Sequence, residues 1–208
     1  MNGRMKIAET KLQINEIFYS LQGEGVQSGI PSVFIRLCRC NLRCDFCDTD
    51  FDRGEWMSLE EILLQIESYA ARHIIWTGGE PALSLTTEIV AFFKQEGYRQ
   101  SIETNGMLPV PKGIDWVTCS PKKEALPFLQ KNFPDGVQEI RWPMTEEGED
   151  PLALSQLPRA EHYCVSPVVD PQDTIYPPQR TLLRCIEFVK NNPHWRLSLQ
   201  IHKVIQIR

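Results

Sequence analysis

Cys40, Cys44 and Cys47 form a C-x3-C-x2-C pattern within one short segment of the chain. Thiolates are soft ligands, and they bind the irons of iron–sulfur clusters. Three cysteines can hold three irons of a cubane [4Fe-4S] cluster, so the fourth iron has no ligand from the protein. A metal with an open coordination position can bind a substrate or cofactor, as catalytic zinc sites do. The pattern therefore predicts a redox centre that takes part in a reaction.

A fourth cysteine, Cys38, leaves a second interpretation open. It lies two residues before Cys40, and four thiolates can close a structural zinc site. Such sites usually join two separated cysteine pairs, whereas these cysteines form one crowded run. Cys38 also ends the apolar residues 32–38, which is typical of a packed strand residue. The spacing favours the cluster, with the zinc site as the alternative.

The composition is that of an ordinary soluble protein. The 208 residues suit one domain, and 42% of them are hydrophobic and 24% charged. A net charge of −5, with no more than two basic residues in a row, excludes a nucleic-acid surface. No stretch is apolar for long enough to span a membrane. Seven cysteines, an odd number, and no apolar signal core at the N-terminus indicate the reducing cytoplasm.

Apolar runs alternate with segments of helical periodicity along the chain. The predicted strands lie at residues 14–21, 32–38, 73–77, 99–103, 115–119, 138–142, 162–165 and 196–201. Ser58 and Glu61 form a capping box, which predicts that a helix begins there. A second helix is predicted from a cap at Ser84 or Thr86 to Gly97, and a third at residues 182–189.

This alternation predicts parallel β/α units joined by right-handed crossovers. The chain is short for a complete eight-fold barrel, which typically has about 250 residues. Residues 122–158 are rich in proline and weakly helical, so we expect helices to be lost there. The predicted fold is an incomplete, open β/α barrel of the α/β class, with residues 1–208 in a single domain.

Chemically useful residues follow the predicted strands directly. They are Cys40 and the segments 78–80, 103–105 and 120–122. The carboxyl ends of parallel strands meet at one edge of a barrel or sheet, where active sites form. We therefore expect these segments to gather on one rim around the predicted redox centre.

At these residues the chain resembles radical S-adenosylmethionine (SAM) enzymes. The cysteine loop has an aromatic residue, Phe46, before its last cysteine, and Thr77-Gly-Gly-Glu-Pro81 is similar to the GGEP motif of that superfamily. More narrowly, the chain resembles the 7-carboxy-7-deazaguanine synthases. The segments that carry this resemblance are residues 20–25 (SLQGEG), 34–36, 47–49 (CDT), 103–106, 120–122 and 197–203.

The resemblance implies a reaction and its cofactors. SAM would bind the open iron of the [4Fe-4S] cluster and be cleaved by an electron from it, giving methionine and a 5′-deoxyadenosyl radical. The radical would take hydrogen from C6 of 6-carboxy-5,6,7,8-tetrahydropterin. The ring would then contract with loss of ammonia to 7-carboxy-7-deazaguanine, a queuosine precursor. The family regenerates SAM and needs Mg2+, and flavodoxin or ferredoxin would donate the electron.

The resemblance also implies the residues that contact SAM. Gly78 and Gly79 have no Cβ and would let the backbone approach SAM, and Glu80 would accept from its ammonium group. Glu103, with Asn105, would reach the ribose. The full SAM set is Phe46, Asp48, Gly78, Gly79, Glu80, Glu103, Ser120, Pro121, Lys122, Ser166, Pro167, Val168 and Val169. Taken alone, these segments are equally typical of polar turns.

The substrate and Mg2+ are assigned to a second set. Thr49 would ligate Mg2+, with substrate oxygens completing the shell that a hard cation prefers. Arg36 lies in an apolar strand and needs a partner, either the substrate carboxylate or an internal acid such as Glu24. The substrate set implied by the resemblance is Leu21, Gln22, Gly23, Glu24, Arg36, Thr77, His202 and Arg208.

Two departures from the family pattern affect the expectations. Arg39 stands where the family usually has glycine before the first cysteine, which puts the local turn in doubt. The reduced helical segment 122–137 opens one side of the barrel or forms a surface of the homodimer that the family predicts. The alternative functions are a glycyl-radical activase, which acts on a protein partner, and a zinc-stabilised interaction module.

Overall fold

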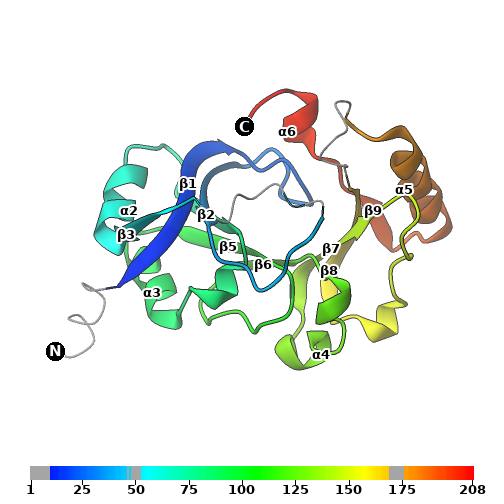
Figure 1. Cartoon of the computed structure of the whole chain (residues 1–208), viewed down its shortest axis with the longest axis horizontal. Coiled ribbons are helices and arrows are strands. Elements are labelled where there is room, and N and C mark those ends of the chain that lie inside the picture. Colours follow the sequence, from blue (N-terminus) through cyan, green and yellow to red (C-terminus); the bar gives the residue numbers. More distant parts are fainter. Residues whose placement is uncertain (1–9, 46, 48–52, 169–175) are drawn as a thin grey trace.

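The computed structural model describes residues 10–45, 47, 53–168 and 176–208. Its centre is a nine-stranded sheet with the order β3-β1-β2-β4-β5-β6-β7-β8-β9 (Figure 1). The strands are β1 (Lys11–Leu21), β2 (Pro31–Leu37), β3 (Glu55–Ser58), β4 (His73–Gly78), β5 (Arg99–Thr104), β6 (Trp116–Cys119), β7 (Val137–Met144), β8 (Ala160–Pro167) and β9 (Trp195–Leu197).

Helices connect the strands and cover the sheet. The α-helices are α2 (Leu59–Ile66), α3 (Thr87–Gln95), α4 (Leu129–Asn132), α5 (Gln179–Asn191) and α6 (Ile201–Val204), and the short 3-10 helices are η1 (Pro81–Leu83), η2 (Lys123–Ala125) and η3 (Leu154–Gln156). Neighbouring strands from β2 to β9 are parallel. Because β3 and β9 end the order, the sheet is open, which confirms the prediction of an incomplete β/α barrel.

The first and last predicted strands differ from the expectation. β1 is antiparallel to β2, because only residues 22–30 join them and a parallel pair needs a crossover of about a dozen residues or more. β3, which the sequence pattern did not predict, pairs antiparallel with β1. The strand predicted at 196–201 ends at Leu197, and a short helix, α6, follows.

Two helices begin where their capping residues predict. The Ser58 hydroxyl accepts from the Glu61 N–H at 3.1 Å, and the Glu61 carboxylate accepts from the Ser58 N–H at 2.6 Å, which is a complete capping box. Thr86 caps α3 by accepting from the Ile89 N–H at 3.3 Å. Both caps fix the helices so that their apolar faces pack against the sheet.

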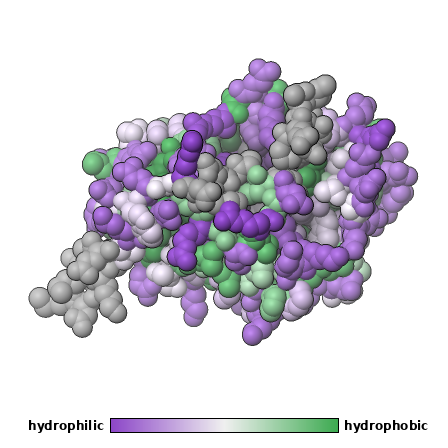
Figure 2. Space-filling view, viewed as in Figure 1, coloured by the Kyte–Doolittle hydropathy of each residue, from purple (hydrophilic) through white to green (hydrophobic). Residues whose placement is uncertain are grey.

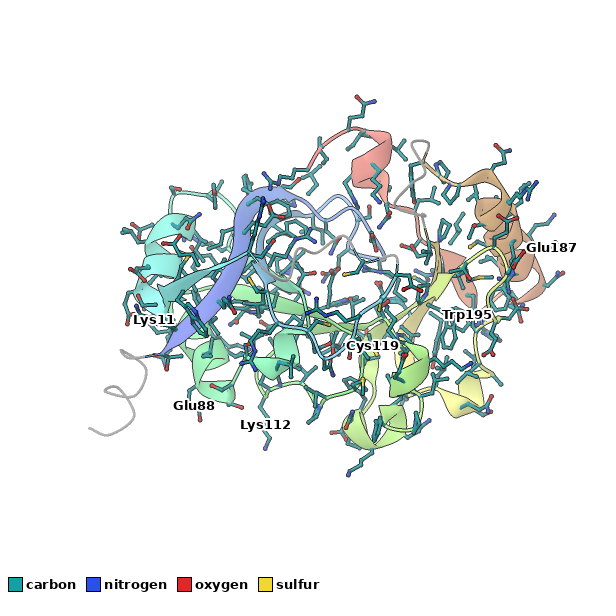
Figure 3. All side chains as sticks on the ribbon, in the orientation of Figure 1. Lys11, Glu88, Lys112, Cys119, Glu187 and Trp195 are labelled. Atoms are coloured by element: carbon teal, nitrogen blue, oxygen red, sulfur yellow. The ribbon has the colours of Figure 1, made fainter. Side chains whose placement is uncertain are left out.

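The hydrophobic core has two parts. One lies between the β1–β5 half of the sheet and the helices α2 and α3, and Trp76 and Phe93 are fully buried in it. The other lies between β6–β9 and the helices α4 and α5, and Cys119 is fully buried in it. Figure 3 shows Glu88 and Lys112 pointing away from the core, and both are exposed. Between β6 and β7 the helical part is reduced to η2 and the four-residue α4, as predicted.

The end of the chain returns to its beginning. After β9, the Ile201 N–H donates to the Gly23 carbonyl at 2.8 Å, and the Ser20 hydroxyl donates to the Arg208 carbonyl at 2.5 Å. Figure 1 shows α6 and the C-terminus beside β1. Hydrophilic side chains predominate on the face seen in Figure 2, and none of the described helices has the length and apolarity to cross a bilayer.

Candidate active site

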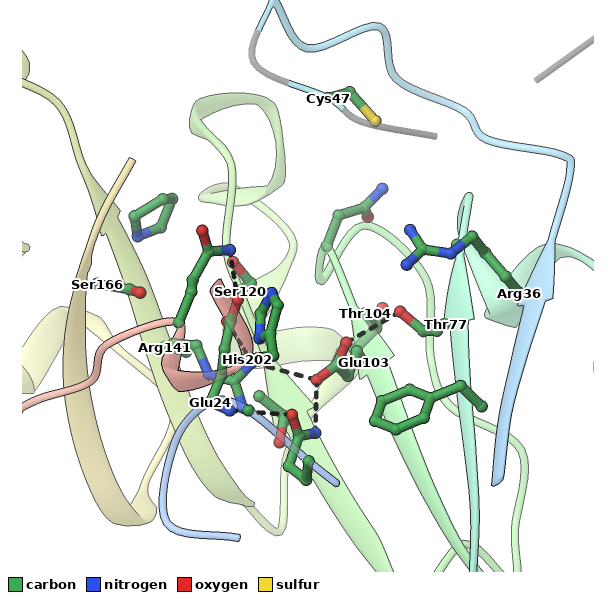
Figure 4. A pocket seen from close by; sticks show the side chains of 18 of the residues that line it. Glu24, Arg36, Cys47, Thr77, Glu103, Thr104, Ser120, Arg141, Ser166 and His202 are labelled. Carbon is green, nitrogen blue, oxygen red and sulfur yellow. Dashed lines mark hydrogen bonds and ion pairs between the residues drawn. The ribbon is translucent and has the colours of Figure 1, made fainter. Parts of the chain in front are cut away.

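A cavity of about 340 Å³ opens at the carboxyl ends of the parallel strands. It is lined by Cys40 and by parts of the segments after β4, β5 and β6, together with residues from β1, β7, β8 and the C-terminus. The rim predicted from the sequence is therefore present. In Figure 4, Cys47 lies on one side of this cavity, and Glu24, Glu103 and Arg141 lie on the other.

The cysteine side carries all three predicted ligands. Cys40, Cys44 and Cys47 line the cavity, and the Cys47 N–H donates to the Cys44 carbonyl at 3.1 Å. Burial raises the pKa of the Cys40 and Cys44 thiols, and the Lys122 ammonium opposes this rise at Cys44. Lys122 thus supplies a positive charge where thiolates bound to iron would be negative. The donor set fits a cubane, in which each thiolate binds a different iron.

Cys38 stands apart from this group. Its side chain is buried, it does not line the cavity, and its thiol donates to the Arg53 carbonyl at 3.0 Å. A Cβ on Gly54 would lie only 2.0 Å from the Cys38 sulfur, so the sulfur is enclosed by neighbouring backbone. This placement agrees with a packed strand residue and not with a fourth metal ligand.

The glycine pair after β4 holds the start of the cysteine loop. Gly78 has a φ of +96°, and a Cβ on Gly79 would lie 2.1 Å from the Arg39 carbonyl oxygen. The N–H of Gly79 donates to the Leu37 carbonyl, and that of Glu80 to the Arg39 carbonyl, both at 2.7 Å. The glycines therefore let two loops approach closely. Arg39 keeps an ordinary negative φ with its side chain exposed, so the turn does not require glycine.

Glu80 lies beneath the rim. It is fully buried and accepts from the Ala82 N–H, the Thr104 hydroxyl and the Asn105 N–H at 2.7–3.0 Å. Burial raises the pKa of this carboxyl group, and these hydrogen bonds partly offset the rise. Glu80 joins the ends of β4 and β5 and is absent from the cavity lining, as is Pro121. Their contact with SAM stays a prediction.

The other predicted SAM residues divide into two groups. Gly78, Gly79, Ser120, Lys122, Ser166, Pro167 and Val168 line the cavity. The Lys122 ammonium donates to the Ser120 hydroxyl and carbonyl, both at 2.9 Å, and burial lowers its pKa. Phe46, Asp48, Thr49 and Val169 lie outside the described residues, so the roles predicted for them stay predictions.

Glu103 belongs to the opposite side of the cavity from the cysteines. Its carboxylate accepts from the Gln22 amide at 3.1 Å and from the Thr77 hydroxyl at 2.9 Å. Both partners come from the predicted substrate set, whereas the resemblance assigns Glu103 to SAM. Glu24, Leu21 and Gly23 line the same cavity.

Sequence reasoning missed two charged residues of β7. Arg141 ion-pairs with Glu139 at 2.8 Å, with Glu24 at 2.9 Å and with Glu103 at 3.1 Å. We call these four residues the Arg141 cluster. The sequence pattern predicts residues 138–142 only as a strand, without a role for these charges. Glu139 and Arg141, two residues apart, share one face of it, and two buried charges on one face indicate a paired internal site.

Arg36 faces the cavity with an internal acid beside it. Its Nε lies 3.0 Å from a Glu16 carboxylate oxygen, and its guanidinium lies 5.9 Å from the Phe18 ring centre. An internal acid was the alternative to the substrate carboxylate, and that acid is Glu16 instead of Glu24. Glu16 also pairs with Arg208, so one carboxylate connects β2 to the C-terminus.

The C-terminal segment closes one edge of the cavity. His202 and Arg208, both from the predicted substrate set, line it, and their contact with the substrate stays a prediction. A Cβ on Gly23 would lie 2.1 Å from the His202 Nδ1, so only glycine fits there. The Gln200 amide donates to Glu24 at 2.5 Å, which ties the segment to the Arg141 cluster.

Known proteins are similar to this chain in sequence and in fold. A model described as the Radical SAM superfamily matches residues 34–134. The 7-carboxy-7-deazaguanine synthase of Bacteroides thetaiotaomicron is 40% identical over 94% of this chain and 98% of its own, and that of Haemophilus influenzae is 38% identical over 96% and 95%. The chain belongs to the 7-carboxy-7-deazaguanine synthase family. The crystal structure of QueE from Escherichia coli superposes with a TM-score of 0.70 and 25% identity, covering 97% of this chain and 99% of that one.

Family membership confirms the predicted fold, enzyme class and redox cofactors. The enzyme is a radical SAM protein that uses a [4Fe-4S] cluster and SAM, acts on a small molecule and needs a reductant. This replaces the alternatives of a glycyl-radical activase and a zinc-stabilised interaction module. The synthase cavity has a cysteine side and a carboxylate side.

Proposed function

We propose that this synthase converts 6-carboxy-5,6,7,8-tetrahydropterin to 7-carboxy-7-deazaguanine with loss of ammonia, in the formation of a queuosine precursor. The observation that carries the proposal is the pairing of cysteines and carboxylates across one cavity. A radical generator and a recognition site for a nitrogen-rich ring would thereby lie at the same cavity.

The cysteine side would hold the cofactors. Cys40, Cys44 and Cys47 would each bind one iron, and the glycine pair after β4, with Ser120 and Lys122, would contact SAM. When bound, the cluster and SAM supply the radical that removes hydrogen from the substrate. Because Lys122 is buried beside Cys44, its charge would offset that of the iron–thiolate group.

The carboxylate side would recognise the pterin. A pterin presents an amino group and a ring N–H along one edge, and both are donors. Glu24 and Glu103 offer carboxylate oxygens to the cavity, while Gln22 and Thr77 hold Glu103 in place. Charged acceptors bind such donors more strongly than neutral ones do. This edge would therefore be fixed by Glu24 and Glu103.

The substrate carboxylate would go to Arg36 and Mg2+. Arg36 is planar and suited to a carboxylate, and its present partner is one. The substrate would therefore take over contacts that Glu16 makes. Thr49 would contribute a hydroxyl to Mg2+, with the substrate supplying further oxygens. Replacing Thr49 with alanine should leave uncoupled SAM cleavage intact and weaken the Mg2+ dependence of turnover, and an unchanged Mg2+ titration would remove Thr49 from the metal site.

The C-terminal segment would exclude water from the reaction. Arg208 and His202 stand at the edge of the cavity, where the segment is joined to β1 and to the residue 22–25 loop. The enzyme would act as a single-domain cytoplasmic homodimer and take its electrons from flavodoxin or ferredoxin.

The decisive experiment is anaerobic turnover by the reconstituted enzyme. The protein is incubated with SAM, a reductant, Mg2+ and 6-carboxytetrahydropterin, and the products are identified by mass spectrometry. The expected product is 7-carboxy-7-deazaguanine, with a requirement for SAM and for the substrate carboxyl group. Formation of 5′-deoxyadenosine by an intact cluster, with the pterin left unchanged, would contradict the proposed substrate.

A further inference from the structure

Arg141 lies where three distant segments meet. Glu139 and Arg141 are buried on the same face of β7, while Glu24 belongs to the loop after β1 and Glu103 to β5. The Arg141 Nε donates to Glu139, and its NH1 donates to both Glu24 and Glu103. One nitrogen therefore brings together two carboxylates that lie in segments far apart in the sequence (Figure 4).

The Arg141 cluster has more negative than positive charge. Three carboxylates surround one guanidinium, and in the part of the chain that the structure describes, the other side chains that donate to Glu24 and Glu103 are neutral, from Gln22, Thr77 and Gln200. A partly buried group with surplus acceptors binds a ligand that brings donors. Glu24 and Glu103 both line the cavity, so their unused acceptor positions would face a bound ligand.

Glu139 fixes the guanidinium from behind. One of its oxygens accepts from the Arg141 Nε at 2.8 Å and the other from the Val26 N–H at 2.9 Å. Gly25 has a φ of +66°, and a Cβ there would lie 2.2 Å from a Glu139 carboxylate oxygen. The loop that carries Glu24 is therefore seated directly on Glu139 and Arg141.

We propose that Arg141 is a positioning residue, held by Glu139, that fixes Glu24 and Glu103 as a pair of hydrogen-bond acceptors and thereby makes the site select a 2-amino pterin over its 2-oxo analogue. The inference rests on the proposed function. Arginine suits this role because its planar fork serves several carboxylates at once, whereas a lysine ammonium is a single point charge.

The charge of Arg141 also controls the ionisation of Glu103. Burial would raise the pKa of Glu103, but the guanidinium and the hydrogen bonds from Thr77 and Gln22 outweigh it and hold this pKa below its usual range. Among described residues, Glu24 and Glu139 pair with the same guanidinium, the Lys122 ammonium interacts electrostatically with Glu24, and His202 stands at the edge of the cavity. Without Arg141, the main opposing charge is lost, and burial would raise the pKa of Glu103.

The test compares two ligands and three variants. Calorimetry under anaerobic conditions, with the reconstituted enzyme and SAM, measures the Kd of 6-carboxypterin and of 6-carboxylumazine, which has an oxygen in place of the amino group. The variants are Arg141→Gln, Arg141→Lys and the control Arg180→Gln. Arg180 pairs with Glu146 on the surface, and neither residue lines the cavity, so the variant removes an arginine charge outside the site.

The wild type and Arg180→Gln should prefer the pterin. Arg141→Gln should reduce this preference by about tenfold or more, because a protonated carboxyl group can donate to the 2-oxo group. Its pterin affinity should also weaken as the pH falls from 8 to 6, while the wild type changes less. Arg141→Lys keeps the charge, so the pH profile should stay like that of the wild type while the pterin Kd rises about tenfold.

Three results would overturn the inference. A preference unchanged in Arg141→Gln shows that the carboxylates need no positioning. Where Arg141→Gln fails to fold, a wild-type Kd for Arg141→Lys leads to the same conclusion. A wild-type enzyme that binds neither ligand and makes no product refutes the proposed function itself, which separates that failure from failure of the inference alone.

Discussion

The two sides of the synthase cavity are built in different ways. Cys40, Cys44 and Cys47 come from one continuous segment, so their spacing is written directly in the sequence. The Arg141 cluster is assembled from the loop after β1 and from β5 and β7, and Glu24 and Arg141 are 117 residues apart. A local motif can assemble whenever its metal is present, whereas the Arg141 cluster requires the complete sheet.

The largest effect is expected when one thiolate is removed from the cysteine side of the cavity. Cys44→Ala should abolish cluster assembly and every trace of 5′-deoxyadenosine, because an iron loses its ligand. Iron and sulfide analysis with the visible absorption spectrum measures the first effect, and chromatography measures the second. Cys185→Ala is the matched control, since Cys185 is buried in α5 and should not affect the cluster. Cleavage of SAM by the Cys44 variant would show that the cluster lies elsewhere.

The difference between a local motif and a cluster of distant residues explains which parts of the site could be predicted from the sequence. The cysteines and the segments after β4, β5 and β6 were predictable because parallel strands place their carboxyl ends on one rim. The antiparallel direction of β1 could have been predicted from the short connection of residues 22–30. The short α6 could not, because its position depends on contacts with Gly23 and β1. Arg36 needed a partner, but only the structure shows that Glu16 lies beside it.

The charged pair on β7 could have been suspected. Gln138-Glu-Ile-Arg-Trp142 places Glu139 and Arg141 on one face of a predicted strand, alternating with Ile140. Such charges are rarely buried unless they are paired. The sequence does not say, however, that Glu24 and Glu103 complete the group. That information lies only in the register of β7 and in the path of the loop after β1.

A second test asks to which side Glu103 belongs. Glu103→Gln should raise the KM for 6-carboxytetrahydropterin by roughly 10- to 100-fold, because a charged acceptor is lost from the substrate side. The KM for SAM and the rate of uncoupled SAM cleavage should stay near those of the wild type. Steady-state kinetics with each compound varied separately measures both. A rise confined to the KM for SAM would restore the original assignment of Glu103 to the ribose.

A third test separates two roles of Gly25: its close contact with Glu139 and its positive φ. Gly25→Ala places a methyl group against Glu139 and should raise the substrate KM about tenfold by shifting Glu24. Gly29 also has a positive φ, of +89°, but nothing lies within 4 Å of its missing Cβ. Gly29→Ala should therefore cost about 1 kcal/mol of stability, measured by thermal unfolding, without changing KM. Equal KM values for the two variants would mean that the contact with Glu139 is unimportant.

The smallest expected effect concerns Arg208, and its size decides between two roles. The side chain is 71% exposed and pairs with Glu16, and exposed ion pairs contribute little. If Arg208 only fastens the C-terminal segment, Arg208→Gln should raise the substrate KM by no more than about fivefold. If it binds the substrate directly, as the resemblance implies, the loss should reach roughly 10- to 100-fold. Salt separates the two roles further. If Arg208 only fastens the segment, about 0.5 M NaCl screens its exposed ion pair and should remove most of the difference in KM between the variant and the wild type. A large loss that persists in salt would place Arg208 among the substrate-binding residues and leave Glu16 as the partner of Arg36 alone.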